Sequence, residues 1–174
     1  MFEHKPRPEW TAAEEFLTRE VVHPDPAMEQ AIRSAAEAGM PAIEVAPNAG
    51  KLLKLLVQLS GARRVLEIGT LAGFSTIWIG RGLPDDGTVV TCEFLPKHAE
   101  VAWANIDFAG LGEKVEIRLG PALGTLAALE EEGREPFDFI FIDADKENNS
   151  KYLDWAVRLG RPGATVVRDD TVWE

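Results

Sequence analysis

From Arg64 onward, short apolar runs alternate with stretches of helical periodicity. The apolar runs are RRVLEIG, TVVTCEF, KVEIRLG, FDFIFIDA and GATVVRDD. Helical stretches separate them, at residues 72–82, 96–110, 123–131 and 150–159. Strands that are apolar along most of their length and joined by helices form a parallel sheet covered on both faces. The alternation therefore predicts a doubly wound α/β fold that binds its ligands at the carboxyl ends of the strands.

The residues before this alternation are predicted to be helical. Helices are expected at 10–22, 26–38 and 50–59, with Asp25 and Asn48 opening the second and third and Gly39 ending the second. The length of 174 residues, 45% of them hydrophobic, suits one core. We expect a single domain, in which residues 1–60 form N-terminal helices and residues 61–174 form the α/β core.

Charge and cysteine content narrow the classes of partner. The formal net charge is −11, and no long run of Lys or Arg is present, which argues against nucleic acid or an anionic membrane as partner. A small molecule is the expected partner. The single cysteine, Cys92, lies in an apolar strand and is interpreted as a core residue. No intrachain disulfide is possible and no apolar targeting segment is visible, so a cytoplasmic location is predicted.

A glycine-containing loop follows the first predicted strand. The segment Glu67-Ile68-Gly69-Thr70-Leu71-Ala72-Gly73-Phe74-Ser75 runs from that strand into a helix. Glycines let the backbone approach a ligand closely, and helix N–H groups favour an anionic group such as a carboxylate. The Gly-x-x-x-Gly spacing differs from the Gly-x-Gly-x-x-Gly pattern of dinucleotide sites. A plain strand-to-helix turn is the alternative interpretation.

Acidic residues stand at the ends of three other predicted strands. Glu93 ends the second, where a carboxylate can accept hydrogen bonds from both hydroxyls of a ribose. Asp143 and Asp145 follow the fourth strand, and Asp169 and Asp170 follow the fifth. Carboxylates brought together at neighbouring strand ends suit a hard divalent cation such as Mg²⁺. Solvated acids or helix caps are the alternative.

Lys146 lies close to these acids in the sequence. It stands three residues beyond Asp143, where a nearby cation would favour the neutral amine that can act as a base. An ordinary surface lysine is the alternative interpretation of this residue.

With these motifs in place, the chain resembles the cation-dependent O-methyltransferases, a family that includes catechol and caffeoyl-coenzyme A O-methyltransferases. The resemblance rests on VLEIGTLAGFSTIWIG, LGPAL, FDFIFIDADKENN and VVRDD, in the order and spacing of that family. It implies a Rossmann-like fold, the cofactor S-adenosylmethionine (SAM), a divalent cation and a phenolic acceptor of the catechol type.

Residue roles follow from the same resemblance. It implies that the cofactor is contacted by Val45, Glu67, Gly69, Thr70, Ser75, Glu93, Ala122 and Asp145. The implied metal ligands are Asp143, Asp169 and Asp170, and the implied general base is Lys146. The reaction expected of such a site is direct displacement, in which a phenolic oxygen attacks the sulfonium methyl group.

The chain departs from the family pattern at two places. Asp169-Asp170 stands where the family usually has Asp-Asn. Family members also continue beyond the equivalent of Glu174 through a helix and an antiparallel pair of strands. Without these, the fifth strand would form an apolar sheet edge, so we expect a homo-oligomer, most simply a dimer. A SAM-binding module with little turnover remains an alternative, as does a nicotinamide-dependent oxidoreductase.

Overall fold

The computed structural model describes residues 8–169 of the chain. The N-terminal part contains α1 (Pro8–Leu17), a π-helix η1 (Thr18–Val22), α2 (Pro26–Glu37) and α3 (Pro47–Ser60). The core strands are β1 (Arg64–Ile68), β2 (Thr88–Glu93), β3 (Val115–Leu119), β4 (Phe137–Ile142) and β5 (Gly160–Arg168). The core helices are α4 (Phe74–Gly82), α5 (Pro96–Phe108), α6 (Ala122–Glu131) and α7 (Asn149–Leu159). Short 3-10 turns η2 (Gly112–Lys114) and η3 (Lys146–Asn148) precede β3 and α7.

The five strands form one parallel sheet in the order β3-β2-β1-β4-β5. The strand order reverses between β1 and β4, so the connections after these two strands leave toward opposite sides. In doubly wound sheets, this reversal opens a crevice at the carboxyl ends of the strands. The predicted fold class is therefore confirmed, and the position of the crevice is fixed by β1 and β4.

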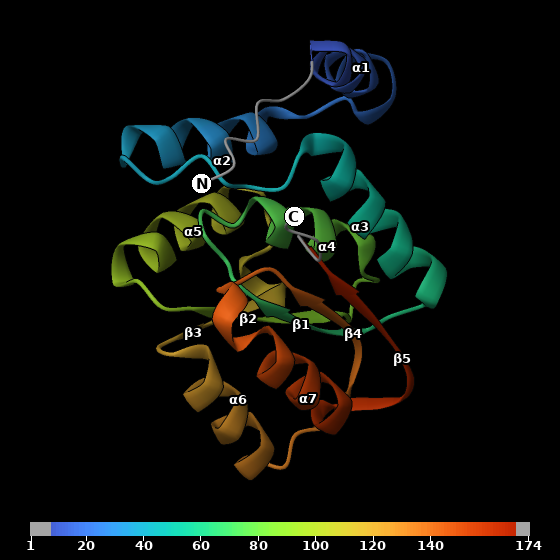
Figure 1. Ribbon diagram of the computed structural model, residues 1–174, viewed down its shortest axis with the longest axis vertical. Coiled ribbons are helices and arrows are strands. Elements are labelled where there is room, and N and C mark those ends of the chain that lie inside the picture. The colour runs from blue at the N-terminus through green and yellow to red at the C-terminus, as the bar shows by residue number, and fades with distance from the viewer. Residues whose placement is uncertain (1–7, 170–174) are drawn as a thin grey trace.

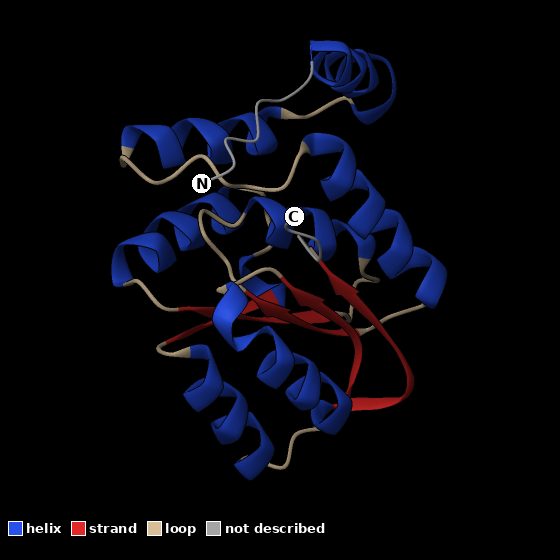
Figure 2. Ribbon diagram, in the orientation of Figure 1, coloured by secondary structure: helices blue, strands red, loops and turns tan. Residues whose placement is uncertain are grey.

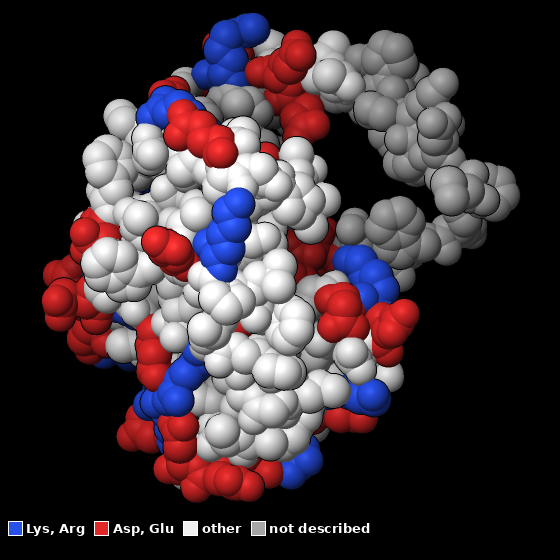
Figure 3. Space-filling view, turned by 90° about the vertical axis from the view of Figure 1, so that its left-hand side faces the viewer, with Lys and Arg blue, Asp and Glu red and all other residues white. Residues whose placement is uncertain are grey.

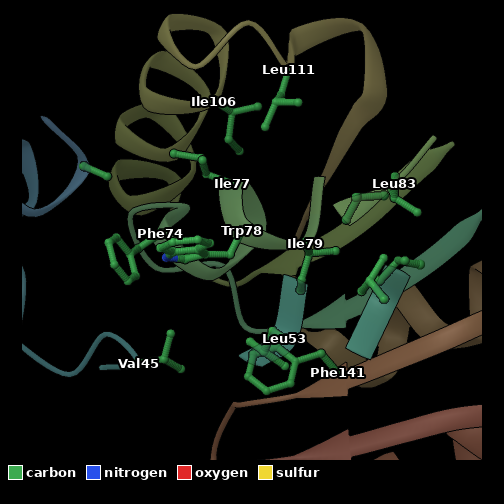
Figure 4. Packing of buried hydrophobic residues seen from close by; sticks show 14 of the residues in the cluster. Val45, Leu53, Phe74, Ile77, Trp78, Ile79, Leu83, Ile106, Leu111 and Phe141 are labelled. Carbon is green, nitrogen blue, oxygen red and sulfur yellow. The ribbon is translucent and has the colours of Figure 1, made fainter. Parts of the chain in front are cut away.

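Helices cover both faces of the sheet, as Figures 1 and 2 show. Alternate residues of each strand point to opposite faces. Val65 and Phe139 pack with α3, α4 and α5 on one side, whereas Leu66 and Ile140 pack with α6 and α7 on the other. Figure 4 shows the first of these two cores, in which Trp78 of α4 lies between Phe74 and Ile79. Cys92 is buried in the second core, as predicted.

Of the N-terminal helices, α3 packs beside α4 on the sheet, whereas α2 forms a further layer over α4 and α5 (Figure 1). Asp25 caps α2 as predicted, because its Oδ1 accepts hydrogen bonds from the N–H groups of Ala27 and Met28 at 3.0 and 3.2 Å. The same carboxylate pairs with Arg81 of α4. Gly39, at φ +66°, follows the end of α2, also as predicted.

Several element boundaries differ from the predictions, among them the starts of α3, α4 and β5. Helix α3 begins at Pro47 with Ala46 as its N-cap, so Asn48 lies inside the helix, where its side chain accepts from the adjacent Ala49 N–H. Proline at the first helical position needs no N–H partner, which explains the earlier start. Helix α4 begins at Phe74 rather than residue 72, and β5 begins at Gly160 rather than residue 163.

None of the helices within residues 8–169 has the length and apolar character needed to cross a membrane.

Candidate active site

Backbone hydrogen bonds just beyond the strands bring the predicted residues to one edge of the sheet. The N–H of Gly69 donates to Cys92 O of β2, and that of Asp143 donates to Ile68 O of β1, at 3.1 and 2.9 Å. The N–H of Asp169 donates to Ile142 O of β4 at 3.0 Å. The residues that follow β1, β4 and β5 therefore lie side by side along the carboxyl edge of the sheet. The strand order creates the crevice at this edge.

The loop after β1 is held in an unusual backbone conformation. Gly69, Leu71 and Gly73 all have positive φ, at +104°, +50° and +82°. A Cβ at Gly69 would lie 1.9 Å from the carbonyl oxygen of Asp143. Glycine is therefore required here by both the backbone angle and the close approach of the chain after β4. Leu71 is a non-glycine residue in the left-handed region, a conformation that persists only when the surrounding structure supports it.

Glu67 is fully buried beneath this loop. Its carboxylate accepts hydrogen bonds from the hydroxyls of Ser75, Thr76 and Thr91, at 2.7, 2.5 and 2.7 Å. The hydroxyl of Thr70 lies 2.6 Å from that of Thr91 and extends the network. Burial raises the pKa of Glu67 to about 7, although the three hydroxyls oppose this shift. The network thus joins the end of β1 to β2 and to the first turn of α4.

Glu93 reaches from β2 to the same loop. One carboxylate oxygen accepts from the N–H of Leu71 and the other from that of Leu95, each at 2.9 Å. Nδ1 of His98 lies 3.5 Å from the second oxygen. Glu93 is 7% exposed, and a carboxylate offers about four lone-pair positions, so further donors can still be accepted. This carboxylate holds Leu71 in its strained conformation.

Two of the predicted metal ligands lie within the described residues. Asp143 and Asp169 are both half-buried and follow the neighbouring strands β4 and β5. Nζ of Lys146 lies 4.0 Å from Oδ1 of Asp143. The third predicted ligand, Asp170, lies outside the described residues. Within residues 8–169, no group of three His, Cys, Asp or Glu side chains is placed to hold a metal ion.

Asp145 acts as a helix cap in this structure. Its Oδ1 accepts from the backbone and side-chain N–H groups of Asn148, at 3.0 and 2.8 Å, and its Oδ2 accepts from the hydroxyl of Tyr152. Burial would raise the pKa of Asp145, but these hydrogen bonds hold it below its ordinary value. The capping alternative thus describes the contacts of Asp145, whose predicted contact with the cofactor remains a prediction.

Val45 and Ala122 pack on opposite faces of the sheet. Val45 is 7% exposed and belongs to the apolar cluster of Phe74 and Trp78, near which Figure 4 places it. Ala122 is the first residue of α6 and is half-buried. The turn before it is tied to β2, because the N–H of Gly120 donates to Glu93 O at 2.8 Å. The structure therefore brings the predicted adenosine-side residues, Glu93 and Ala122, near each other.

Two cavities among the described residues lie away from this edge of the sheet. One of about 540 Å³ is bordered by α1, η1, Pro24 and Pro47, and one of about 330 Å³ lies at the amino-terminal edge of the sheet. Neither is lined by a predicted site residue. We therefore place the candidate site by the strand order and not by these two cavities, because the strand order is a property of the whole sheet. On the face shown in Figure 3, Lys and Arg are scattered among acidic residues and form no extended basic patch.

Several polar residues of the site escaped the sequence analysis. Thr91 and Thr76 hold the Glu67 carboxylate, and Tyr152 holds Asp145. Asn105 of α5 contacts the loop after β1. Thr91 could have been suspected as a polar residue within an apolar strand. The other three stand at ordinary helix positions, so nothing in their local sequence distinguishes them.

A doubly wound sheet with a glycine loop after β1 and an acid at the end of β2 defines a class of α/β enzymes that bind a nucleoside cofactor. The sequence matches the O-methyltransferase family over residues 19–174. It is 51% identical over 161 residues to the catechol O-methyltransferase of Niastella koreensis, covering 92% of this chain and 73% of that protein. Identity to the Mycobacterium tuberculosis catechol O-methyltransferase is also 51%, over 90% of this chain and 70% of the relative.

Solved structures of O-methyltransferases have the same fold as this chain. An O-methyltransferase from Bacillus cereus in complex with SAH superimposes with a TM-score of 0.90 at 49% identity, covering 92% of this chain and 73% of that one. One from Streptomyces achromogenes in complex with SAM gives 0.90 at 40% identity, covering 94% and 74%. The chain therefore belongs to the O-methyltransferase family, and its enzyme class is that of the SAM-dependent O-methyltransferases.

Proposed function

We propose that the chain transfers the methyl group of SAM to one oxygen of a catechol-like phenol, with a divalent cation, Mg²⁺, as cofactor. The observation that carries the proposal is the arrangement of acids at the strand ends. Asp143 and Asp169 follow adjacent strands, Lys146 lies 4.0 Å from Asp143, and the glycine loop follows the next strand of the sheet. The relatives in N. koreensis and M. tuberculosis are catechol O-methyltransferases, which supports this acceptor class.

Residues of the loop after β1 and of the neighbouring strand ends would hold SAM. Glu93 would accept hydrogen bonds from the ribose hydroxyls while keeping its contacts to the two backbone N–H groups. Ser75 donates its only hydroxyl proton to Glu67, so its oxygen retains lone pairs for the ammonium group of the cofactor. We propose that Gly69, Thr70, Val45, Ala122 and Asp145 complete the cofactor site. Glu67 acts through Ser75 in this proposal, because its own carboxylate is fully buried.

The acceptor would be oriented at the edge formed by β4 and β5. The carboxylates of Asp143 and Asp169 are oxygen donors of the kind that Mg²⁺ prefers, and Asp170 is the proposed third ligand. When bound, the cation would supply Lewis acidity toward the phenolic oxygens. Lys146 would accept the proton of the attacking hydroxyl at Nζ.

We also propose that the chain forms a homodimer.

The first test is binding and turnover with defined probes. Titration calorimetry should detect SAM binding to the wild-type chain, and labelled SAM should methylate catechol with Mg²⁺ but not with EDTA. Asp143→Asn should lower kcat by at least about a hundredfold, whereas Asp154→Asn, on the exposed face of α7, should leave it unchanged.

The base is tested separately. Lys146→Met should lower kcat while leaving the Kd of SAM unchanged, and Lys151→Met provides a matched lysine control on the exposed surface. SAM binding with no methyl transfer to any catechol would identify the chain as a cofactor-binding module instead. Full activity of Asp143→Asn would remove the metal from the mechanism.

A further inference from the structure

Asn105 of α5 is a buried polar residue that bridges two distant parts of the chain. It is 2% exposed. Its Nδ2 donates to the carbonyl oxygen of Ala72 at 2.9 Å, and its Oδ1 accepts from the hydroxyl of Ser34 at 3.0 Å. Ala72 belongs to the loop after β1, and Ser34 belongs to α2. One amide therefore links the N-terminal helical layer to the proposed cofactor loop.

The carbonyl of Ala72 needs this partner. Gly73 is the N-cap of α4 and its carbonyl accepts the first helical hydrogen bond, from Ile77 N–H at 2.9 Å. Ala72 precedes the cap, so its carbonyl stands outside the helical ladder while the residue is only 2% exposed. A buried carbonyl without a donor is costly. Asn105 supplies the donor and thereby fixes the peptide plane between Ala72 and Gly73, directly after Leu71 at φ +50°.

The opposite side of the loop is already held by β2. The carboxylate of Glu93 accepts from Leu71 N–H, and Cys92 O accepts from Gly69 N–H. The side facing the N-terminal layer rests on a small apolar cluster, in which Ala72 packs with Ala35 and Met40 of the α2 region. Asn105 is the polar contact on this side that reaches both α2 and the loop.

We infer that Asn105 is a positioning residue for the methyl-transfer reaction, which sets the loop after β1 for SAM and couples that loop to the docking of α2. The inference rests on the proposed function, because it requires that the loop binds SAM. The carbonyl oxygen of Ala72 can only accept a hydrogen bond, so it orients the amide with Nδ2 toward Ala72 and Oδ1 toward the Ser34 hydroxyl. Since coupling between two sites is reciprocal, SAM should in turn stabilise α2 against local opening.

The experiment separates the two contacts of Asn105. Asn105→Asp keeps an acceptor for Ser34 but loses the donor to Ala72, whereas Ser34→Ala removes the hydroxyl on α2, with its contacts to Asn105 and Ala31 O, and keeps the donor to Ala72. Asn105→Ala loses both. We expect Asn105→Asp and Asn105→Ala to weaken SAM binding about tenfold and to raise the KM for SAM with little change in kcat, and Ser34→Ala to weaken it about twofold.

A matched control tests for a merely structural role. Val101→Ala, one turn earlier on α5, trims a side chain packed against the same apolar cluster without touching the hydrogen bonds of Asn105. It should lower the thermal midpoint and leave the Kd of SAM within about twofold of the wild-type value. A second readout is hydrogen exchange of the α2 amides, which SAM should slow in the wild-type chain and slow less in Asn105→Asp.

The outcomes distinguish this inference from the proposed function. A wild-type chain that fails to bind SAM contradicts the proposed function itself. If the wild type binds SAM and Asn105→Asp binds it equally well, the positioning role is wrong. An equal loss of affinity in Val101→Ala and Asn105→Asp also overturns the inference, because it would trace the effect to general destabilisation of α5.

Discussion

Glu67 combines full burial with three hydroxyl donors, and these two features act on its charge in opposite directions. Desolvation disfavours the carboxylate, whereas the hydroxyls of Ser75, Thr76 and Thr91 favour it. Burial is the larger effect, so the pKa rises from 4.5 to about 7. The carboxyl group with this raised pKa lies directly beneath the loop proposed to hold SAM.

A pH dependence of stability follows from this pKa. Between pH 4.5 and 7 the folded protein binds a proton at Glu67 that the unfolded chain has released, so this residue lowers the free energy of unfolding as pH rises. The loss should total about 3 kcal/mol and level off above the folded pKa. Urea unfolding of wild type and Glu67→Gln from pH 4.5 to 8 should show their difference growing with pH in favour of the variant. A constant difference across this range would contradict the raised pKa.

Gly69 offers a test of backbone geometry at the same loop. Gly69→Ala should cost about 3 kcal/mol in the free energy of unfolding, because it combines a left-handed φ of +104° with a Cβ placed 1.9 Å from Asp143 O. Gly61→Ala is the matched control, since Gly61 also has positive φ but nothing within 4 Å of its Cβ position. It should cost only about 1 kcal/mol. Equal losses of stability in the two variants would show that the close approach between Gly69 and Asp143 O does not determine the cost of Gly69→Ala.

At the scale of elements, the attachment of α2 depends on its first residues. Asp25 both caps this helix and pairs with Arg81 of α4, so one side chain starts the helix and anchors it to the core. Burial would raise the pKa of Asp25, but Arg81 and the two backbone N–H groups hold it below the ordinary value. The capping prediction identified the local role, and the fold added the contact to α4.

Substitution at Asp25 should separate these two roles. Asp25→Ala is expected to lower the free energy of unfolding by about 1–2 kcal/mol, because it removes the cap and the ion pair together. Asp25→Asn keeps the capping oxygen and should lose about half of that. Arg33→Ala, exposed on the same helix, is the control and should be nearly neutral in urea unfolding. Equal stability of Asp25→Ala and wild type would mean that α2 is held by its apolar contacts alone.

At the scale of the whole molecule, the sheet has two outer strands, β3 and β5. The β3 edge carries a cluster of ion pairs in which Glu116 contacts Arg118 and Arg134. Charged residues of this kind discourage strand pairing between molecules. In β5 the side chain of Val166 is 39% exposed, and within the described residues its strand pairs with β4 alone. For the homodimer proposed above, we therefore propose pairing through the β5 edge of the described residues.

The proposed dimer gives a direct measurement. Analytical ultracentrifugation of the wild-type chain should detect a dimer, and Val166→Lys should shift it toward monomer, because a lysine on the strand edge disfavours pairing. Val157→Lys is the matched control on the neighbouring helix α7, where Val157 is 75% exposed. A wild-type monomer, or a dimer that withstands Val166→Lys, would contradict pairing through β5.

Local patterns in the sequence determined the strands, most helix boundaries to within one residue, and the positions of the acids at the strand ends. Periodicity and punctuation act over a few residues, so they can be recognised without knowledge of the fold. The same patterns placed Gly69, Glu93, Asp143 and Asp169 at strand ends, and the parallel order of the sheet then brought them to one edge. The family resemblance supplied the roles that such local patterns do not contain.

Tertiary structure alone decided how these residues are used. It buried Glu67 completely and set the Asp143 carbonyl against Gly69. It also joined Ser34 to Ala72 through Asn105, three residues from separate elements. Each of these features depends on which strands and helices become neighbours, and such pairings between distant segments leave no periodic signal in the local sequence.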